Sequence, residues 1–368
     1  MLKRVTFIFA AVFGILLSAG CSKTFDPAPD HGSAIRFGAG SMLLNDDAPQ
    51  RSLTRAAEFK DAFGMNDQFL VWGSKTISGN KYSVFTGQTV SLTGLGANDA
   101  DPSDDVWEYS PLRFWDSNAT RYDFLAVSGV SSSGNVICNP AASGHLTATV
   151  THNVTLSQSD LLAAGGQRTG GSTAKVDLAF QHVLSAVSVV IYNDSPLISV
   201  KLNSCKFRNL CVQASGVVQQ DGNSLAEMTS SHWTPVSYDP SLIMGYSIDG
   251  GANMAARTHY PAEEIWDFMI PQSLVPYLSY TPQLYLDYEY DQANPITDEI
   301  EHNHPQFPID LEEILVKNSS GSYITSWEPG KKYSYEIHIR LGGGVNVNVS
   351  VTDWEEVLAE TPGITLQR

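Results

Sequence analysis

The chain has 368 residues, which is enough for about two domains of roughly 150 residues each. A hydrophobic fraction of 42% and a charged fraction of 17% are those of a folded protein, so disorder along the whole chain is excluded. The sequence has 22 Lys and Arg residues and 39 Asp and Glu residues. The resulting net charge of −17 would repel a polyanion and argues against nucleic acid as a partner.

The amino terminus has the form of a bacterial lipoprotein signal. A short basic segment precedes an apolar run over residues 5–17, which is shorter than the ~20 apolar residues that span a bilayer but fits a secretory signal. Small residues and then Cys21 follow, although Ser18 takes the position where that pattern has leucine. We expect residues 1–20 to be removed and Cys21 to be diacylated, which anchors a chain without a transmembrane helix. An ordinary signal peptide with a chance cysteine is the alternative.

Residues 21–55 have the composition of a tether followed by an exposed loop. Two prolines and few apolar side chains over residues 22–31 predict a flexible start. A short strand is expected at residues 35–37. The polar, proline-containing stretch over residues 45–55 predicts a loop on the surface.

Strands separated by turn residues are predicted over the first half of the remaining chain. Apolar and polar residues alternate over residues 145–156, as in a half-buried strand. A short helix is expected at residues 159–164, and the glycine-rich stretch 165–172 is the candidate domain junction. Aromatic and β-branched runs predict further strands at residues 68–72, 82–85 and 122–127.

The sequence of the second half also predicts mainly strands. Residues 333–341 and 345–351 alternate about a Gly-Gly-Gly turn and predict a hairpin, and residues 310–317 predict a short helix. Few helix signals among so many strands favour an all-β fold of two tandem β-sandwich domains, at residues 56–174 and 175–368. Further strands are expected at residues 176–180, 183–191, 268–270 and 284–290.

Three thiols besides Cys21 remain in the mature chain. On one continuous strand Cys205 and Cys211 would lie ~20 Å apart at ~3.3 Å per residue, too far for a disulfide, whereas a turn between them would bring them together. Their spacing matches no zinc pattern. We interpret Cys138, Cys205 and Cys211 as small buried side chains.

No stretch of the sequence points to catalysis. There is no His-Glu-x-x-His or Gly-x-Ser-x-Gly motif, and the loop at residues 165–172 lacks the lysine of a phosphate-binding loop. Residues 301–304, Glu-His-Asn-His, have a spacing that one strand face could offer to a metal, but a solvated loop is favoured. The acidic residues 99–105 lack the glycine and the glutamate of a calcium loop. The sequence therefore predicts no enzyme, no metal and no cofactor.

Four motifs in the second half resemble the fimbrillin family of Bacteroidetes, the lipoprotein-derived subunits of type V pili. The resemblance implies two transthyretin-like β-sandwich domains, in agreement with the strand pattern. The motifs are Leu-Ala-Phe-Gln-His-Val-Leu-Ser-Ala-Val at residues 178–187, Phe-Met-Ile-Pro-Gln at 268–272, Trp-Glu-Pro-Gly-Lys-Lys-Tyr-Ser-Tyr at 327–335 and Val-Thr-Asp-Trp at 351–354.

The resemblance also implies a route of assembly. Family members reach the outer membrane as lipoproteins, and an arginine-specific protease removes an N-terminal segment whose loss opens a hydrophobic groove. The C-terminal segment of a neighbouring subunit fills that groove by β-strand addition. Here the removed strand would lie within residues 35–44, and the cut would follow Arg55 or, as a second choice, Arg51. The donor residues would be Ile364 and Leu366, unless the tail is frayed or forms the last strand of its own domain.

The implied partners are other fimbrial subunits, the protease, the outer membrane through the lipid on Cys21, and adhesion ligands on host or bacterial surfaces. The implied location is the outer membrane and then the fimbrium. Two alternatives remain open. The chain is never cut and serves as a lipid-retaining anchor subunit, or it is a surface lipoprotein that binds glycans through exposed aromatic residues such as Trp107, Tyr109 and Trp115.

Overall fold

The computed structural model describes residues 33–40, 63–96, 104–130, 135–140, 145–156, 159–172, 174–239, 251–262, 265–276, 281–317, 321–340, 344–353 and 364–366. Over these ranges the chain is built of strands, with the short 3₁₀ segments η2 (Ser230–His232) and η3 (Leu311–Ile314) between them. The predicted all-β class is thus confirmed. No helix within the described ranges is long and apolar enough to cross a membrane.

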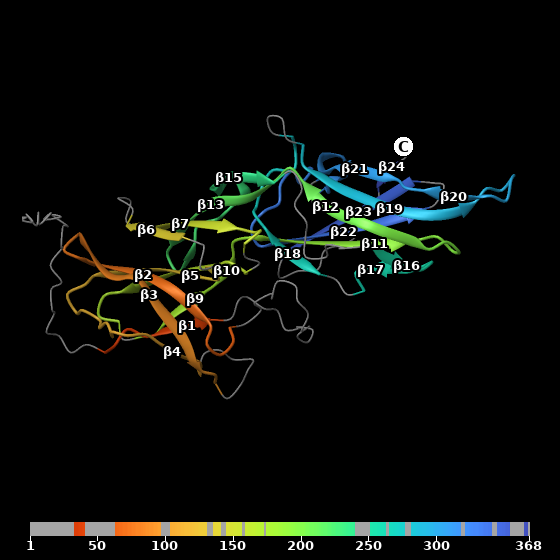
Figure 1. Ribbon diagram of the computed structural model, residues 1–368. Coiled ribbons are helices and arrows are strands. Elements are labelled where there is room, and N and C mark those ends of the chain that lie inside the picture. The colour runs from red at the N-terminus through yellow and green to blue at the C-terminus, as the bar shows by residue number, and fades with distance from the viewer. Residues whose placement is uncertain are drawn as a thin grey trace, which may run out of the picture.

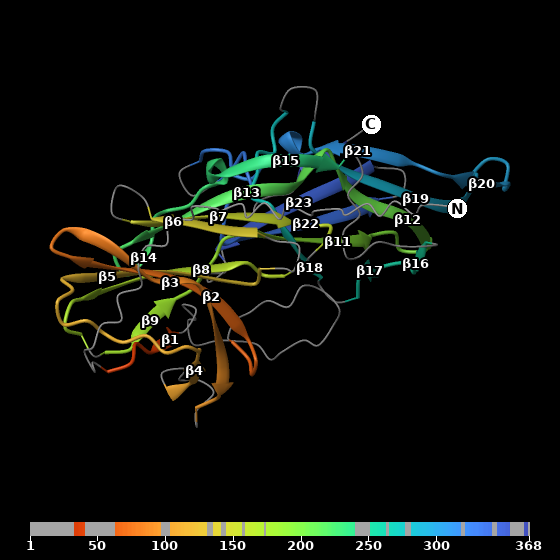
Figure 2. The ribbon, with the colours of Figure 1, turned by 60° about the vertical axis from the view of Figure 1, so that its left-hand side comes forward.

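One end of the molecule is built on a six-stranded sheet (Figures 1 and 2). A separate two-stranded sheet, formed by β1 (Phe37–Gly40) and β9 (Val176–Ala179), lies against it. The order of the large sheet is β10 (Gln181–His182), β8 (Leu162–Thr169), β5 (Arg121–Ser128), β2 (Gln68–Ile77), β3 (Asn80–Gly94) and β4 (Val106–Glu108).

A third sheet covers the other face of the six-stranded one. Successive residues of a strand point to opposite faces, and in β5 Phe124 belongs to the core shared with β1 while Leu125 belongs to the second core. At β5 the six-stranded sheet is therefore a middle layer that is buried on both faces. The covering sheet has the order β14 (Ser224–Leu225), β13 (Leu210–Asp221), β7 (Leu146–Asn153) and β6 (Asn135–Pro140), with β15 (Trp233–Asp239) also paired to β13.

The other end of the molecule is a two-layer sandwich. Phe207 of one sheet meets Tyr335 of the other with ring centroids 5.8 Å apart. One sheet contains β17 (His259–Tyr260), β11 (Ser185–Asn193), β22 (Lys331–Arg340), β23 (Gly344–Asp353) and β24 (Ile364–Leu366), with β18 (Trp266–Met269) beside β11. The other contains β16 (Ala252–Met254), β12 (Val200–Arg208), β19 (Gln283–Ala293) and β20 (Ile300–Asn303), with β21 (Gln306–Asp310) beside β19.

Strands from both sides of residue 175 pair with one another. β9 pairs with β1, β10 pairs with β8, and β13 pairs with β7 over Gln213↔Asn153 to Gln219↔Thr147. These pairings interleave the two halves of the chain near residue 175. The limits 56–174 and 175–368 remain a prediction.

The segment before β9 corrects the sequence analysis twice. Residues 159–164 form no helix, and Gly165 and Gly166 belong to strand β8 and not to a linker. A Cβ atom on Gly165 would lie 1.8 Å from the backbone oxygen of Ser224, so glycine is required there by the close approach of two layers. A short apolar run that is buried on both faces carries no period, which is why helix and strand could not be separated.

Other sequence predictions are confirmed. β7 alternates between buried and half-buried residues, and β22 and β23 form the expected hairpin with Ile337 opposite Val347. Cys205 lies on β12 and Cys211 on β13, and both are free and buried as predicted, whereas Cys138 is free but only half-buried. Burial raises the pKa of Cys205 to about 12 and that of Cys211 to about 11.

Residues of three of the four motifs make buried contacts, and Trp354 of the fourth lies outside the described residues. Trp327 is fully buried and donates from Nε1 to the Tyr335 hydroxyl at 3.0 Å. The Gln272 amide accepts from the Cys211 backbone nitrogen at 2.6 Å and donates to the Cys211 oxygen at 3.1 Å. His182 contacts the buried Asp160 carboxylate at 2.9 Å. These side chains serve packing.

Candidate functional site: the seat of strand β1

Strand β1 packs on the face of the middle sheet. We call its binding site, formed by β9 and the rings of Phe69, Phe85, Tyr109 and Phe124, the seat of β1. Its backbone pairs in parallel with β9, in the register Phe37↔Val176 to Gly40↔Ala179. Since β9 is the only strand paired with β1 in this two-stranded sheet, the β1 backbone pairs with another strand along one of its two edges. Parallel strands are joined by a long connection, and here β1 precedes β2 while β9 follows β8 in the sequence.

Apolar side chains fill the seat. Ile35, Phe37 and Ala39 have exposed fractions of 0%, 2% and 3%, while Arg36 between them is exposed. Burying an Ile or Phe side chain stabilises by about 1.5–3 kcal/mol each. The side chains of Ile35, Phe37 and Ala39 therefore point into the core and Arg36 points outward, although Gly38 on the outer face is also buried.

An aromatic cage surrounds the Phe37 ring. Its centroid lies 6.0 Å from that of Phe69, 5.4 Å from Phe85, 5.7 Å from Tyr109 and 5.7 Å from Phe124. All four pairs meet edge to face, which is the arrangement that ring quadrupoles favour. The Phe37 ring thus fills an aromatic socket formed by these four rings.

The segment just before β1 is held by a different part of the chain. The Ile35 nitrogen donates to the Arg113 oxygen at 2.8 Å, and the Trp115 nitrogen donates to the Ser33 oxygen at 3.2 Å. The Tyr109 hydroxyl donates to the Ile35 oxygen at 2.7 Å. Burial raises the pKa of Tyr109, since the phenolate would lose hydration. Main-chain groups therefore provide much of the attachment, and they would serve any strand of suitable side-chain pattern.

The described structure does not place the residues predicted for lipidation, cleavage and strand donation at the seat of β1. Cys21, Arg51 and Arg55 fall outside the described residues. Ile364 and Leu366 lie on β24, which pairs antiparallel with β23 through Val347↔Ile364 and Val345↔Leu366. In this chain the tail thus extends the sheet of its own sandwich, and the structure does not bring it to the seat of β1.

The aromatic residues considered for stacking on a sugar are part of the first core. Trp107 and Trp115 have exposed fractions of 7% and 3%, and Tyr109 is packed against Phe37. Neither tryptophan offers a face to a ligand. The glycan-binding alternative therefore loses the residues on which it was based.

The histidines of residues 301–304 make local contacts. His302 lies 2.8 Å from Asp291, and His304 lies 2.8 Å from Asp287. Within the described ranges, no group of three or more His, Cys, Asp or Glu residues has a metal-binding arrangement. The acidic stretch 99–105 lies largely outside those ranges.

Sequence reasoning expected a strand at residues 35–37 but missed its partners. The parallel pairing with β9 and the contact with Tyr109 depend on positions about 140 and 74 residues away, and local pattern carries no such information. A repeated apolar alternation at Ile35, Phe37 and Ala39 was the only available signal.

The fimbrillin-like family profile matches residues 54–354, and the chain belongs to this family. It is a structural and adhesive subunit of a cell-surface fimbria and not an enzyme. No curated protein sequence matches the chain.

Solved structures share a distant likeness with the chain. The crystal structure of a putative cell adhesion protein from Bacteroides eggerthii is 10% identical with a TM-score of 0.41, over 90% of this chain and 98% of that one. The tip fimbrial protein Mfa3 of Porphyromonas gingivalis is 11% identical with a TM-score of 0.38, over 82% and 97%. The fimbrial anchor protein Mfa2 of the same organism is 10% identical with a TM-score of 0.29, over 88% and 97%. It is the family match that assigns the chain.

Proposed function

We propose that this subunit is exported as a lipoprotein on Cys21 and joins a fimbria by exchange of strand β1. A protease cuts after Arg55, or after Arg51, and β1 leaves its seat. The C-terminal strand of a neighbouring subunit, carrying Ile364 and Leu366, then enters the same seat.

The observation that carries the proposal is the seat itself. Phe37 fills an aromatic socket, and among the described residues β9 is the only strand that pairs with β1. Once a cut separates β1 from the rest of the chain, nothing covalent retains it, and the exposed groove with its free backbone groups is a template for another strand.

Net charge does not oppose or drive the exchange. The segment at residues 21–55 carries four basic and four acidic residues, so its loss leaves the charge of the mature chain unchanged. Subunits of the same negative charge repel one another, and assembly must therefore come from strand pairing and apolar contacts. The four basic residues are Lys23, Arg36, Arg51 and Arg55, and the four acidic ones are Asp26, Asp30, Asp46 and Asp47.

The donor strand has to leave its own sheet first. β24 has three residues and pairs only with β23, at the edge of the sheet. Such a short edge strand can be displaced at little cost in free energy, which is compatible with a role in a neighbouring subunit.

The test is controlled proteolysis of the purified chain lacking residues 1–21. An arginine-specific protease is expected to release a fragment ending at Arg55 or Arg51 and to convert the monomer into heat-resistant oligomers. Mass spectrometry identifies the fragment, and size-exclusion chromatography measures the oligomers. Arg51→Ala combined with Arg55→Ala should remain monomeric, and so should wild type with inactivated protease. Truncation after residue 362 should allow cleavage but stop assembly.

Two results would contradict the proposal. Cleavage that leaves only monomers would exclude strand exchange as the route of assembly. A chain isolated from native membranes with its lipid, and uncut after residue 55, would support the lipid-retaining anchor instead.

A further inference from the structure

The outer face of the covering sheet carries no charge at its centre. On β7, Thr147, Thr149 and Thr151 alternate with buried residues and so point away from the core. The outward residues of β13 from Gln213 to Gln219, and those of β6, likewise include no Asp, Glu, Lys or Arg. In the whole chain, by contrast, 17% of the residues are charged. We call the outward residues of β6, β7 and β13 the neutral face.

Strand pairing arranges the neutral face in rows. Ile137 of β6, Thr149 of β7 and Val217 of β13 lie opposite one another. In the next row the Thr151 and Ser215 hydroxyl oxygens are 3.1 Å apart. Ile137 and Val217 are 53% and 36% exposed, so two large apolar side chains lie open on a face rich in hydroxyl groups. A partner can cover this face without the cost of desolvating a charge.

The composition of the neutral face is that of the centre of a protein interface. Such interfaces are depleted in charged residues at their core and keep polar residues at the rim. Here Asp221 and Asp239 stand at the last positions of β13 and β15, beyond the uncharged rows. The β-branched side chains of the face are also confined to few rotamers before any partner arrives, so little conformational entropy is lost when they are covered.

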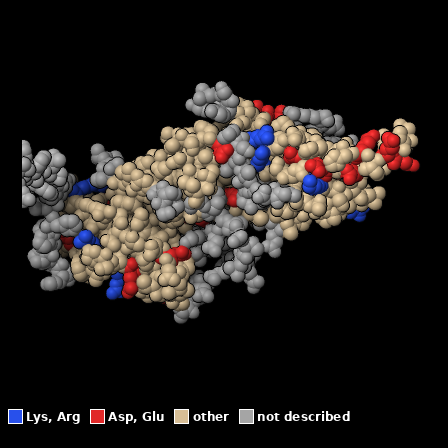
Figure 3. All heavy atoms as spheres, in the orientation of Figure 1, with Lys and Arg blue, Asp and Glu red and all other residues tan. Residues whose placement is uncertain are grey.

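The opposite end of the molecule carries acidic groups. Figure 3 shows a stretch of uncharged residues over β6 and β7 on the side in view, whereas acidic groups gather at the tip formed by β19 and β20. The exposed residues of that tip include Asp291, Glu299 and Glu301. Since the chain carries a net charge of −17, two copies repel one another wherever such groups meet. The neutral face is a place where this repulsion is small.

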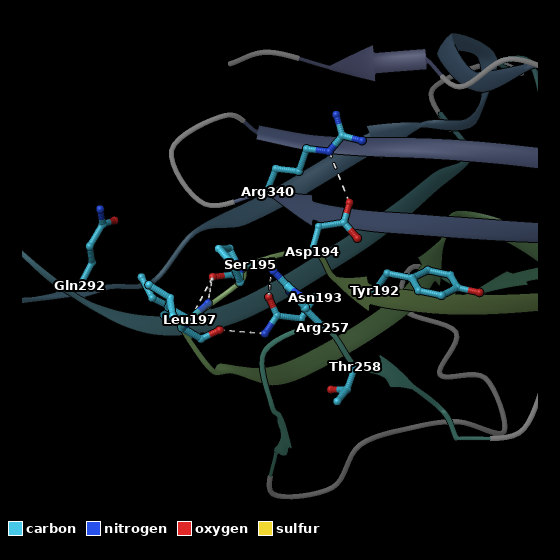
Figure 4. Close-up of a pocket in the computed structure, with 11 residues that line it drawn as sticks. Tyr192, Asn193, Asp194, Ser195, Leu197, Arg257, Thr258, Gln292 and Arg340 are labelled. Atoms are coloured by element: carbon cyan, nitrogen blue, oxygen red, sulfur yellow. Dashed lines mark hydrogen bonds and ion pairs between the residues drawn. The ribbon is translucent and has the colours of Figure 1, made fainter.

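A pocket in the two-layer sandwich offers a weaker case for binding. Its volume is about 730 Å³. In Figure 4 the side chains of Gln292, Thr258 and Arg340 point away from one another, and Arg340 donates from Nε to Asp194 at 3.3 Å. These polar groups therefore do not converge on one ligand, whereas the side chains of the neutral face all point outward from one sheet.

We propose that the neutral face docks on the neutral face of a second copy of this chain, sheet against sheet. Sheets that pack face to face lie ~10 Å apart with their side chains interdigitated. A two-fold axis brings the same surface of both copies together, so Ile137 and Val217 of each copy are covered and no acidic group enters the centre of the contact. The proposal goes beyond strand exchange, since it requires neither cleavage nor a donor strand.

The size of the neutral face indicates a weak contact between single copies. With ~3.4 Å per residue along β7 and ~4.8 Å between strands, the face covers about 400 Å² on each copy. Stable interfaces bury about 800 Å² per partner, so one such contact alone is transient. Where copies of the subunit repeat along a fibre, many weak contacts acting together raise the overall affinity by about 10²–10⁴. The contact therefore joins fibres side by side and does not build the fibre itself.

Clumping of coated beads tests the proposal, because each bead presents many copies at once. The chain lacking residues 1–21 carries a biotin at its amino end and is bound to streptavidin-coated latex beads. It also carries Arg51→Ala and Arg55→Ala, which remove the proposed cleavage sites. Light scattering is expected to show clumping of these beads and none of beads coated with albumin. High salt should preserve or increase the clumping, since it screens repulsion between like charges, whereas a contact made of ion pairs would weaken.

Charge placed on the neutral face separates it from the other surfaces. Ile137→Lys and Val217→Lys each put a cation into the contact and should slow clumping at least tenfold, although each also reduces the negative net charge of the chain. Thr89→Lys is the matched control, because Thr89 is an exposed strand residue on β3 of the middle sheet and its replacement changes the net charge equally. Thermal unfolding of all three variants must match that of the unsubstituted chain.

Three results would overturn the proposal. Coated beads that stay dispersed at every salt concentration exclude a contact between copies, and clumping that both face variants retain places the contact on another surface. Adherence of the coated beads to lactose-coated beads, in place of mutual clumping, would assign the neutral face to an uncharged glycan. None of these outcomes bears on strand exchange, because the chain on the beads lacks the proposed cleavage sites.

Discussion

Phe37 and Phe124 meet edge to face, with ring centroids 5.7 Å apart and an interplanar angle of 86°. Phe37 comes from the N-terminal strand β1, and Phe124 comes from the centre of the middle sheet. The contact joins the strand proposed to leave the molecule to the layer on which both cores are built. It is therefore one of the contacts that would retain β1 after cleavage.

Replacing Phe37 should loosen β1. We expect Phe37→Ala to destabilise the fold by about 3–5 kcal/mol, the usual range for removing a buried Phe ring. Urea unfolding measures this change, and hydrogen exchange should show loss of protection at Ile35 and Val176. Arg36→Ala is the matched control, since its side chain is exposed on the same segment. An unchanged unfolding midpoint for Phe37→Ala would show that the ring is not a structural plug.

Gly165 should tolerate no side chain. A Cβ atom there would meet a backbone oxygen at 1.8 Å, so Gly165→Ala must separate β8 from β14. Overpacking of this kind costs about 1–3 kcal/mol or more. Thermal unfolding provides the measurement, with Gly64→Ala as the control, because the nearest atom to its Cβ would be 3.9 Å away. Similar midpoints for the two variants would contradict the close approach of these layers.

Acid should destabilise the covering sheet through His152. This side chain is 2% exposed, and burial lowers its pKa from 6.5 to about 4. The unfolded chain takes up a proton below pH 6.5 while the native chain does not. Stability is therefore complete above pH 6.5 and falls between pH 6.5 and 4, by as much as about 3 kcal/mol.

A variant isolates the contribution of His152. His152→Leu should flatten the pH dependence of the urea midpoint between pH 6.5 and 4, whereas His302→Gln, at an exposed position, should retain it. Loss of Asp116 ionisation occurs at lower pH, because the hydrogen bond from Lys75 lowers the pKa of this carboxyl. The two effects are thus separable, and a steep slope that persists in His152→Leu would exclude this assignment.

The cysteines should react only when the fold opens. The thiols of Cys205 and Cys211 are buried, and their raised pKa values disfavour the reactive thiolate. With an aromatic disulfide reagent at pH 8, both are expected to remain unmodified in the native protein and to react in 6 M guanidinium. Half-buried Cys138 should be the first to react. A disulfide between Cys205 and Cys211 in the purified protein would contradict their placement as free thiols.

Patterns of period two were readable because each strand buries one face. The alternation of Leu146, Ala148 and Val150 predicted β7, and the alternation through Ile337 and Val347 predicted the hairpin, whose register the structure then gave. The four sequence motifs indicated the family for a related reason, since residues such as Trp327 and Gln272 make specific buried contacts.

The sequence by itself determined the all-β fold class, the β22–β23 hairpin and the family, because these depend on which neighbouring residues alternate between core and solvent. Tertiary structure alone decided that β8 is a strand, since burial on both faces erases the period, and that Gly165 is needed where two layers touch. It also decided that Phe37 lies beside Val176 and inside an aromatic socket. Pairings over such distances arise from the packing of whole layers, and no local preference encodes them.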